Sequence, residues 1–211
     1  MGKKSDTKSR VLESAAALFS AKGYAETSLM DICEGAGANK AAVNYYFRSK
    51  ENLYAEAWRM EFERSVSAYS LDGGVPASAP VEQRLYGHIL SMGQRISDSN
   101  GREFEIIEKE RANPTGLLAE IMQKVIEPAR RNLMTILTEL LGEKAKPAHI
   151  QLCGASIMSQ TMGIFMGEKV RGKVHHRPAI GGPIEDIADH ITQFSLAGIR
   201  AMRKRIEREA K

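Results

Sequence analysis

The feature that most constrains this 211-residue chain is a series of short helix-forming segments near its start, separated by glycines. Apolar residues including Val11, Ala15 and Phe19 recur at spacings of three and four, which predicts an amphipathic helix over 7–22 that stops at Gly23. Two shorter helices are predicted on either side of Gly37, over 27–34 and 39–47. Three such helices at the front predict one small helical module.

The spacing around Gly37 is that of a helix-turn-helix. This motif needs a small residue where its two helices cross and a residue that tolerates positive φ at the turn. Cys33 and Gly37 meet these needs, and apolar residues are available to lock the two helices together: Ile32, Ala36, Ala38, Val43 and Tyr46. We therefore expect residues 1–50 to form a DNA-binding domain.

The segment after the turn is the expected recognition helix in the major groove. Asn39, Lys40 and Asn44 are predicted to read base edges, because Asn pairs with adenine and Lys reaches guanine acceptors. Side chains able to touch thymine methyl groups are Ala41 and Ala42. Phosphate contacts are predicted for hydroxyl, aromatic and basic side chains: Thr27, Ser28, Tyr45, Tyr46, Arg48 and Lys50, with Lys3, Lys4, Lys8 and Arg10 on a flexible arm.

Charge alone does not carry this interpretation. The net charge of +4 is modest, and residues 1–60 hold nine Lys and Arg against seven Asp and Glu. A hydrophobic content of 43% and a charged content of 27% are typical of globular proteins. Low aromatic content and the lack of alternating β-branched runs predict an all-α fold. Without a signal-peptide core or an apolar run of membrane-spanning length, a cytoplasmic protein is expected.

The second domain is expected over 51–211, as a helical bundle for effector binding and dimerisation. Its predicted helices cover 50–69, 81–97, 103–112, 115–141, 147–171 and 185–208. A Gly-, Pro- and Ser-rich stretch over 71–80 predicts a loop between two of them. Pro128 is expected to kink or split the helix that contains it.

Met and Phe side chains on these helices are suited to the adaptable walls of a small-molecule site. Glu108 and Arg111 would supply polar selectivity, although an ordinary helix core and an i,i+3 ion pair explain the same residues. The predicted effector contacts are Phe104, Glu108, Arg111, Met122, Met158, Met162 and Phe165.

No catalytic residue, cofactor or metal is predicted. Cys33 and Cys153 lie far apart in the sequence, so neither a disulfide framework nor a zinc knuckle is indicated. His149 and Cys153 have a spacing that could hold a metal, but no further ligand pair accompanies them. His175 and His176 are expected in an exposed loop.

Residues 27–53, with the sequence TSLMDICEGAGANKAAVNYYFRSKENL, resemble the DNA-binding signature of the TetR family of repressors. The first helix and the turn after it also match, through Ala16, Leu18, Phe19 and Gly23-Tyr24. The family commonly has Gly and Thr where this chain has Ala41 and Ala42, and Tyr where it has Asn44. The operator sequence is therefore not carried over. The stretch Val-Asn-Tyr-Tyr-Phe resembles a variant whose C-terminal domain has a segment like 111–115.

The resemblance implies a homodimer that packs through its last two long helices and binds a palindromic operator. Two-fold symmetry suits recognition helices that must reach half-sites about 34 Å apart. A small molecule in the bundle is then expected to change their separation and to release DNA, at a coupling free energy of about 1–3 kcal/mol. Two alternatives stay open: an α-helical enzyme, for which the sequence offers no convergent site, and a ligand-independent DNA binder with poor sequence preference.

Overall fold

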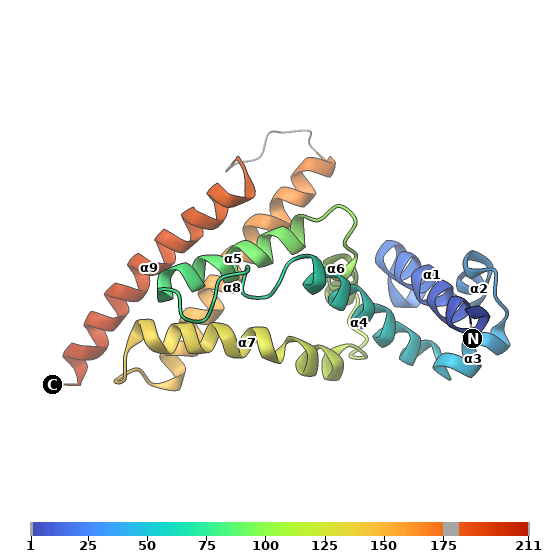
Figure 1. The fold of residues 1–211 in the computed structure, drawn as a ribbon, viewed down its shortest axis with the longest axis horizontal. Helices are drawn as coiled ribbons and strands as arrows, with labels where there is room; N and C mark the ends of the chain where they lie inside the picture. Colours follow the sequence, from blue (N-terminus) through green and yellow to red (C-terminus); the bar gives the residue numbers. More distant parts are fainter. Residues whose placement is uncertain (1, 175–181, 211) are drawn as a thin grey trace. The chain divides into compact units, whose positions relative to one another are not determined.

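A computed structural model describes residues 2–174 and 182–210, with the side chains of 6–169 and 182–210. All regular elements of these residues are α-helices, which confirms the predicted all-α class (Figure 1). The predictions for the side chains of Lys3 and Lys4, and for His175 and His176, fall outside the described residues. No helix in the described ranges combines the length and hydropathy needed to cross a bilayer.

The chain divides into two compact units, Met1–Ser67 with Asn100–Ile126 (unit 1) and Ala68–Ser99 with Glu127–Lys211 (unit 2). The segment 100–126 thus packs with the N-terminal helices although it follows residues of unit 2 in sequence. The expected functional division after residue 50 is a separate matter and stays a prediction.

Unit 1 contains α1 (Gly2–Glu26), α2 (Leu29–Ala36), α3 (Lys40–Phe47), nearly all of α4 (Lys50–Ala68), α6 (Glu103–Ala112) and the first turns of α7 (Ala119–Leu141). Helix α1 packs on α2, α3 and α6, and α2 packs on α3. The fully buried side chains at the centre of this unit include Phe19, Ile32, Leu53, Tyr54 and Trp58. A helix at the front is therefore held by one that comes much later in the sequence.

The predicted helix ends lie within one residue of those in the structure except in α1, α2, α7 and α8 (Pro147–Val174). Helix α8 runs to Val174, three residues past the expected end. Helix α1 already begins at Gly2, and Gly23 interrupts it with a φ of 82° and a ψ of 177°. Helix α2 runs to Ala36, two residues past the expected end. Helix α7 begins at Ala119 and not at residue 115, because Gly116 has a left-handed φ of 76° that a helix does not allow. The carboxylate of Glu110 accepts the backbone N–H groups of Thr115 and Gly116 in this turn.

Unit 2 contains α5 (Val81–Ser97), α8 (Pro147–Val174), α9 (Ile184–Glu209) and the rest of α7. Helix α5 packs against both α8 and α9, and these two pack on each other. Glu139 of α7 forms an ion pair with Arg84 of α5. Pro128 lies inside α7, which continues through it, so the expected split does not occur.

Candidate nucleic-acid interface

Helix α2 begins with a capping box. The Ser28 hydroxyl accepts the N–H of Asp31 at 3.1 Å, and the Asp31 carboxylate accepts the N–H of Ser28 at 3.3 Å. The N–H of Ser28, and to a lesser extent its hydroxyl, lower the pKa of Asp31, because they favour the charged form of its carboxylate. The exposed Ser28 thus marks an ordered helix N-terminus, where a phosphate group finds a favourable dipole.

The turn between α2 and α3 depends on Gly37. Its φ of 56° and ψ of 41° are left-handed, and its N–H reaches the carbonyls of Cys33 and Glu34. Of the positions predicted to lock the two helices, Ile32, Ala36 and Val43 are buried, while Ala38 and Tyr46 are half-buried. The small residue Cys33 is buried as well. Gly35 lies against α1, where a Cβ would come within 2.6 Å of Ser14 Oγ.

Helix α3 separates buried from exposed residues along its length. Val43 and Phe47 are buried, and the Asn39 side chain caps the helix by accepting the N–H of Ala42 at 2.9 Å. Ala42 and Tyr46 are half-buried. The predicted contact residues that are exposed on this helix and its cap are Asn39, Lys40, Ala41, Asn44 and Tyr45, with Tyr45 at 70%.

The junction of α3 and α4 is a strained turn at Arg48. Its φ of 67° is the one positive value outside glycine among the described residues, and the N–H of Ser49 donates to Phe47 O at 2.8 Å across it. Such a γ-turn is rare for a residue with a Cβ. A hollow of about 330 Å³ next to it is lined by Lys8, Tyr46, Phe47, Arg48, Asn52, Ala55 and Glu56. Sequence patterns give no signal for this conformation.

Two of the predicted phosphate contacts are engaged within the protein. Thr27 is buried, and its hydroxyl donates to Gly23 O at 2.7 Å, so it orders the turn between α1 and α2. The ammonium of Lys50 donates to Tyr24 O at 2.6 Å and lies 4.1 Å from the centre of the Tyr24 ring. Desolvation by this partial burial lowers the pKa of Lys50.

The predicted effector residues are divided between the two units. In unit 1, Phe104 is buried, Met122 is half-buried, and Glu108 and Arg111 are exposed. In unit 2, Met158 and Met162 are half-buried, while Phe165 is 1% exposed. Within unit 2, Phe165 packs against Gly93 of α5.

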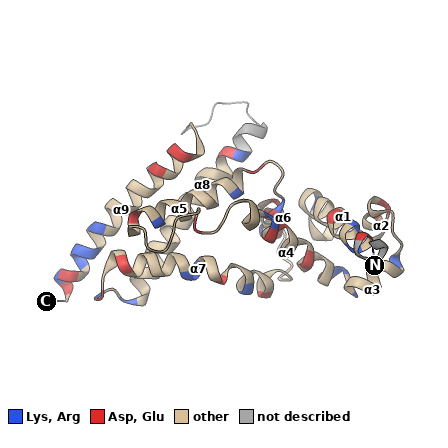
Figure 2. Cartoon of the chain, in the orientation of Figure 1, with Lys and Arg blue, Asp and Glu red and all other residues tan. Residues whose placement is uncertain are grey.

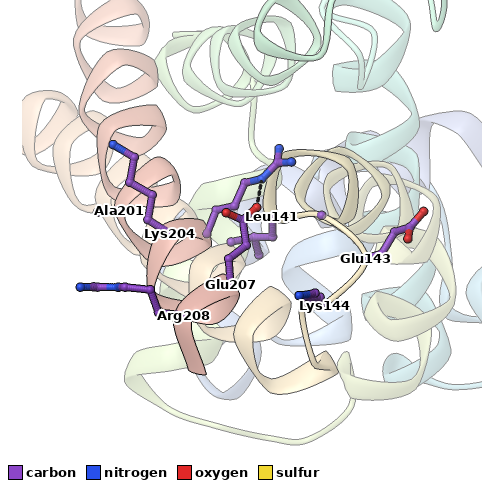
Figure 3. A pocket seen from close by; sticks show the side chains of 9 residues that line it. Leu141, Glu143, Lys144, Ala201, Lys204, Glu207 and Arg208 are labelled. Atoms are coloured by element: carbon purple, nitrogen blue, oxygen red, sulfur yellow. Dashed lines mark hydrogen bonds and ion pairs between the residues drawn. The ribbon is translucent and has the colours of Figure 1, made fainter. Parts of the chain in front are cut away.

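A hollow at the end of α7 in unit 2 does not resemble a site for a small effector. It measures about 910 Å³ and is lined at the end of α7, the following turn and the last turns of α9. In Figure 3 the side chains of Lys204 and Arg208 point away from the turn that carries Glu143 and Lys144. Arg203, on the same helix, pairs with Glu207. The charged groups that line this hollow therefore do not converge on one point.

His149 and Cys153, whose spacing could hold a metal, do not form a metal site with further ligands in the part of the chain that the structure describes. The Nδ1 atom of His149 accepts the N–H of Lys146 at 3.1 Å, which places this side chain at the start of α8 as a cap. Cys153 is half-buried, and burial raises the pKa of its thiol. The described residues contain no cluster of three or more His, Cys, Asp or Glu that could hold a metal ion.

Comparison with known families identifies both parts of the chain. Residues 11–57 match the family described as "Bacterial regulatory proteins, tetR family". Residues 81–199, more than half of the chain, match "HTH-type transcriptional dual regulator CecR, C-terminal domain".

Individual relatives have low sequence identity to this chain. The HTH-type transcriptional regulator AcrR of Shigella flexneri is 24% identical over 79% of this chain and 76% of its own length. The icaADBC negative regulator IcaR of Staphylococcus aureus is 32% identical over 31% of the chain and 40% of that protein. A 3-methyl-2-oxobutanoate hydroxymethyltransferase of Sinorhizobium medicae is 28% identical over 73% of the chain, which spans 63% of that protein.

Among solved structures, a TetR-like transcriptional regulator from Rhodococcus sp. RHA1 has the same fold. It aligns with a TM-score of 0.65 at 18% identity, over 92% of this chain and 96% of that one. At this identity the likeness concerns the fold alone, and it extends over the helices of both units.

Proposed function

Because this chain belongs to the TetR family of DNA-binding transcriptional regulators, we propose that it is a repressor that binds a palindromic operator as a homodimer and releases it when a small molecule binds its C-terminal helices. Repression is supported by the relative IcaR, which is described as a negative regulator. The residues that we propose to contact DNA are Ser28, Asn39, Lys40, Ala41, Ala42, Asn44, Tyr45, Tyr46 and Arg48. Thr27 and Lys50, which the sequence also predicted as contacts, hold the turns before α2 and at the start of α4 from inside the protein.

The observation that carries this proposal is the two-sided character of α3. Its buried side chains, Val43 and Phe47, fix the helix on the module, while Asn39, Lys40 and Asn44 are exposed. Amides and an ammonium on one exposed helix are the groups that read purine edges in the major groove. The capped N-terminus of α2 and the Arg48 turn flank this helix and suit backbone phosphates.

A homodimer through α8 and α9 is supported by apolar surface within unit 2. Leu152 of α8 and Phe194 of α9 are 68% and 63% exposed. They border a mostly apolar hollow of about 340 Å³ that also involves Ile157, Ile199 and Met202. Large exposed apolar patches on soluble proteins commonly mark interfaces.

The charge distribution along α9 favours an antiparallel pairing of its two copies. Figure 2 shows acidic residues near the start of α9 and mostly basic residues toward its end. The acidic group is Glu185, Asp186 and Asp189, and the basic group is Arg200, Arg203, Lys204, Arg205 and Arg208. In an antiparallel pair, each basic end would lie next to the acidic end of the other copy.

Effector binding is proposed for the residues predicted from the sequence, taken separately in each unit: Phe104, Glu108, Arg111 and Met122 in unit 1, and Met158, Met162 and Phe165 in unit 2. We also propose that the protein acts without catalysis of its own. The similarity to a hydroxymethyltransferase is limited to 28% identity, whereas the two family matches cover residues 11–57 and 81–199 and both describe regulators.

The decisive experiment is footprinting on the DNA upstream of the protein's own gene, followed by anisotropy titrations. We expect Lys40→Ala and Asn44→Ala each to weaken binding to the protected site about 5- to 150-fold, as loss of a base contact of about 1–3 kcal/mol implies. Asn44→Ala should hardly change binding to scrambled DNA. The control is Lys124→Ala, which removes an exposed charge of α7 that pairs with Glu120.

Equal affinity of the wild type for the protected site and for scrambled DNA would identify a non-specific binder instead. The dimer is tested by light scattering on Phe194→Asp, with Ala77→Asp in the exposed loop as control. Only the first variant should be monomeric. The effector proposal requires that at least one compound that raises the melting temperature also releases the operator.

A further inference from the structure

The carboxylate of Glu110, on α6, accepts hydrogen bonds from four donors within unit 1. The hydroxyl of Tyr54 lies 3.1 Å from Oε2. The N–H groups of Thr115 and Gly116 each lie 2.9 Å from Oε1, and the Thr115 hydroxyl lies 2.9 Å from both oxygens. One side chain therefore joins α4 to the segment 113–118, which leads into α7. Four acceptor sites are about what an ionised carboxylate offers.

Tyr54 passes this connection into the core of the DNA-binding helices. Its side chain is fully buried, and its ring centre lies 4.8 Å from that of Phe19, edge to face, and 5.1 Å from that of Tyr24. Phe19 and Tyr24 belong to α1. Glu110 thus binds the aromatic cluster of Tyr54, Phe19 and Tyr24 through the Tyr54 hydroxyl.

The cluster also contacts the first residues of α4, which directly follow the recognition helix in the sequence. The Tyr24 hydroxyl donates to Glu51 Oε1 at 2.7 Å, and Lys50 Nζ donates to the Tyr24 carbonyl. The bond to Tyr24 is the main reason that the pKa of Glu51 falls to about 2. A shift of the Tyr54 or Tyr24 ring would therefore change how α4 starts, and with it the orientation of α3.

We propose that Glu110 is the positioning residue through which the segment 113–118 controls the start of α4 and hence the recognition helix. This inference rests on the proposed ligand switch, for which it names the connection inside unit 1. Helix α7 is continuous from Ala119 into unit 2, and the boundary of the two units falls within it after Ile126. A displacement of α7 would pull first on the residues that Glu110 holds.

The chemistry of the contact suits this role. Hydrogen bonds to an ionised carboxylate are stronger than neutral ones, so the Glu110 contacts resist small forces as a group. Burial and the neighbouring Glu110 carboxylate raise the pKa of Tyr54, so its hydroxyl stays a donor at physiological pH. A bond made and broken as a unit can couple two segments that share no direct contact.

The experiment compares full-length wild type, Tyr54→Phe, Glu110→Gln, Glu110→Ala and the double variant Tyr54→Phe/Glu110→Gln. Hydrogen exchange followed by mass spectrometry is read at residues 50–56 and 113–118. Each variant should speed exchange several-fold in both segments, although Tyr54→Phe touches only one of them. The matched control is Glu120→Gln, at an exposed position of α7, which should leave exchange in both segments unchanged.

Operator affinity provides the second measurement. Each single variant should weaken operator binding about 5- to 10-fold, and the double variant should be no weaker than the worse single one, since both remove the same connection. Exchange that rises only at Thr115 and Gly116, with operator affinity unchanged, would show that Glu110 merely caps its own loop and would overturn the proposal.

The two arms separate this inference from the proposed function. Hydrogen exchange requires neither operator nor effector, so it decides the connection even if the wild type binds no specific site. Glu110→Gln and Tyr54→Phe keep the size of the side chain and carry the test if Glu110→Ala does not fold.

Discussion

Phe165 of α8 lies with the edge of its ring directly over Gly93 of α5. A Cβ on Gly93 would come within 2.4 Å of Cζ and 2.6 Å of Cε2. Phe165 is only 1% exposed, so its ring has little room to withdraw. The contact sets how closely α5 and α8 approach in unit 2, which carries three of the proposed effector residues.

Gly93→Ala is therefore expected to destabilise the protein by about 1–3 kcal/mol, the usual cost of overpacking, in urea unfolding. Phe165→Leu should lose stability by leaving space. The double variant Gly93→Ala/Phe165→Leu should be more stable than the sum of the two single effects predicts, because the smaller side chain accommodates the methyl group. Strict additivity would mean that the two residues do not set this distance.

A second close contact joins α2 to α1. A Cβ on Gly35 would lie 2.6 Å from Ser14 Oγ, whose hydroxyl donates to Ile32 O at 3.0 Å. Gly35→Ala should cost about 1–2 kcal/mol, because the methyl group displaces this hydroxyl and leaves its hydrogen bond unmade. Adding Ser14→Ala should recover part of the loss. Thermal melts of Gly35→Ala, Ser14→Ala and the double variant measure this recovery. If there is none, the backbone of α2 has moved instead.

Arg48 provides a test of function at a strained residue. Its φ of 67° is unfavourable for a side chain with a Cβ and costs about 1–3 kcal/mol. Arg48→Gly relieves this strain but adds freedom to the unfolded chain, so we expect stability to stay equal or to rise by about 1 kcal/mol. Arg48→Ala retains the strain and should match the wild type.

Both Arg48 variants should bind operator DNA more weakly and with a smaller salt dependence, since each lacks one cationic group for a phosphate. Undiminished affinity in both variants would exclude Arg48 from the interface, whatever their stability. The comparison separates the turn from the charge, because only the glycine variant changes the backbone.

His88 predicts a pH dependence of stability. It is buried on α5, and desolvation and then the nearby Arg95 lower its pKa from 6.5 to about 4, against a smaller opposing effect of the Leu71 backbone. The unfolded chain thus binds a proton more readily than the folded one between these values. The contribution of the neutral imidazole is complete above pH 6.5 and is lost as the pH falls toward 4, by up to about 3 kcal/mol.

Urea unfolding at a series of pH values measures this effect. His88→Leu should flatten the decline between pH 6.5 and 4, whereas His190→Gln, at an exposed position of α9, should leave it unchanged. If the wild type and His88→Leu lost stability in parallel over this range, the buried imidazole would not be the cause.

Local patterns in the sequence were enough to predict the helix-turn-helix. Capping at Ser28 and Asn39, the left-handed turn at Gly37 and the buried face with Val43 involve residues only a few positions apart. Interactions of that range act in any helical context, so the sequence alone determines them. The helix positions in the rest of the chain follow from the same periodicity.

Three features were decided by the tertiary structure. Residues 100–126 join the DNA-binding helices, Lys50 turns inward to Tyr24, and Glu110 holds the turn with the left-handed Gly116 that precedes α7. The first two depend on partners that only the fold brings together, and the third depends on a carboxylate that also binds Tyr54 of the distant helix α4. Short-range interactions therefore determine the recognition helix α3, while long-range contacts determine which other segments hold it in place.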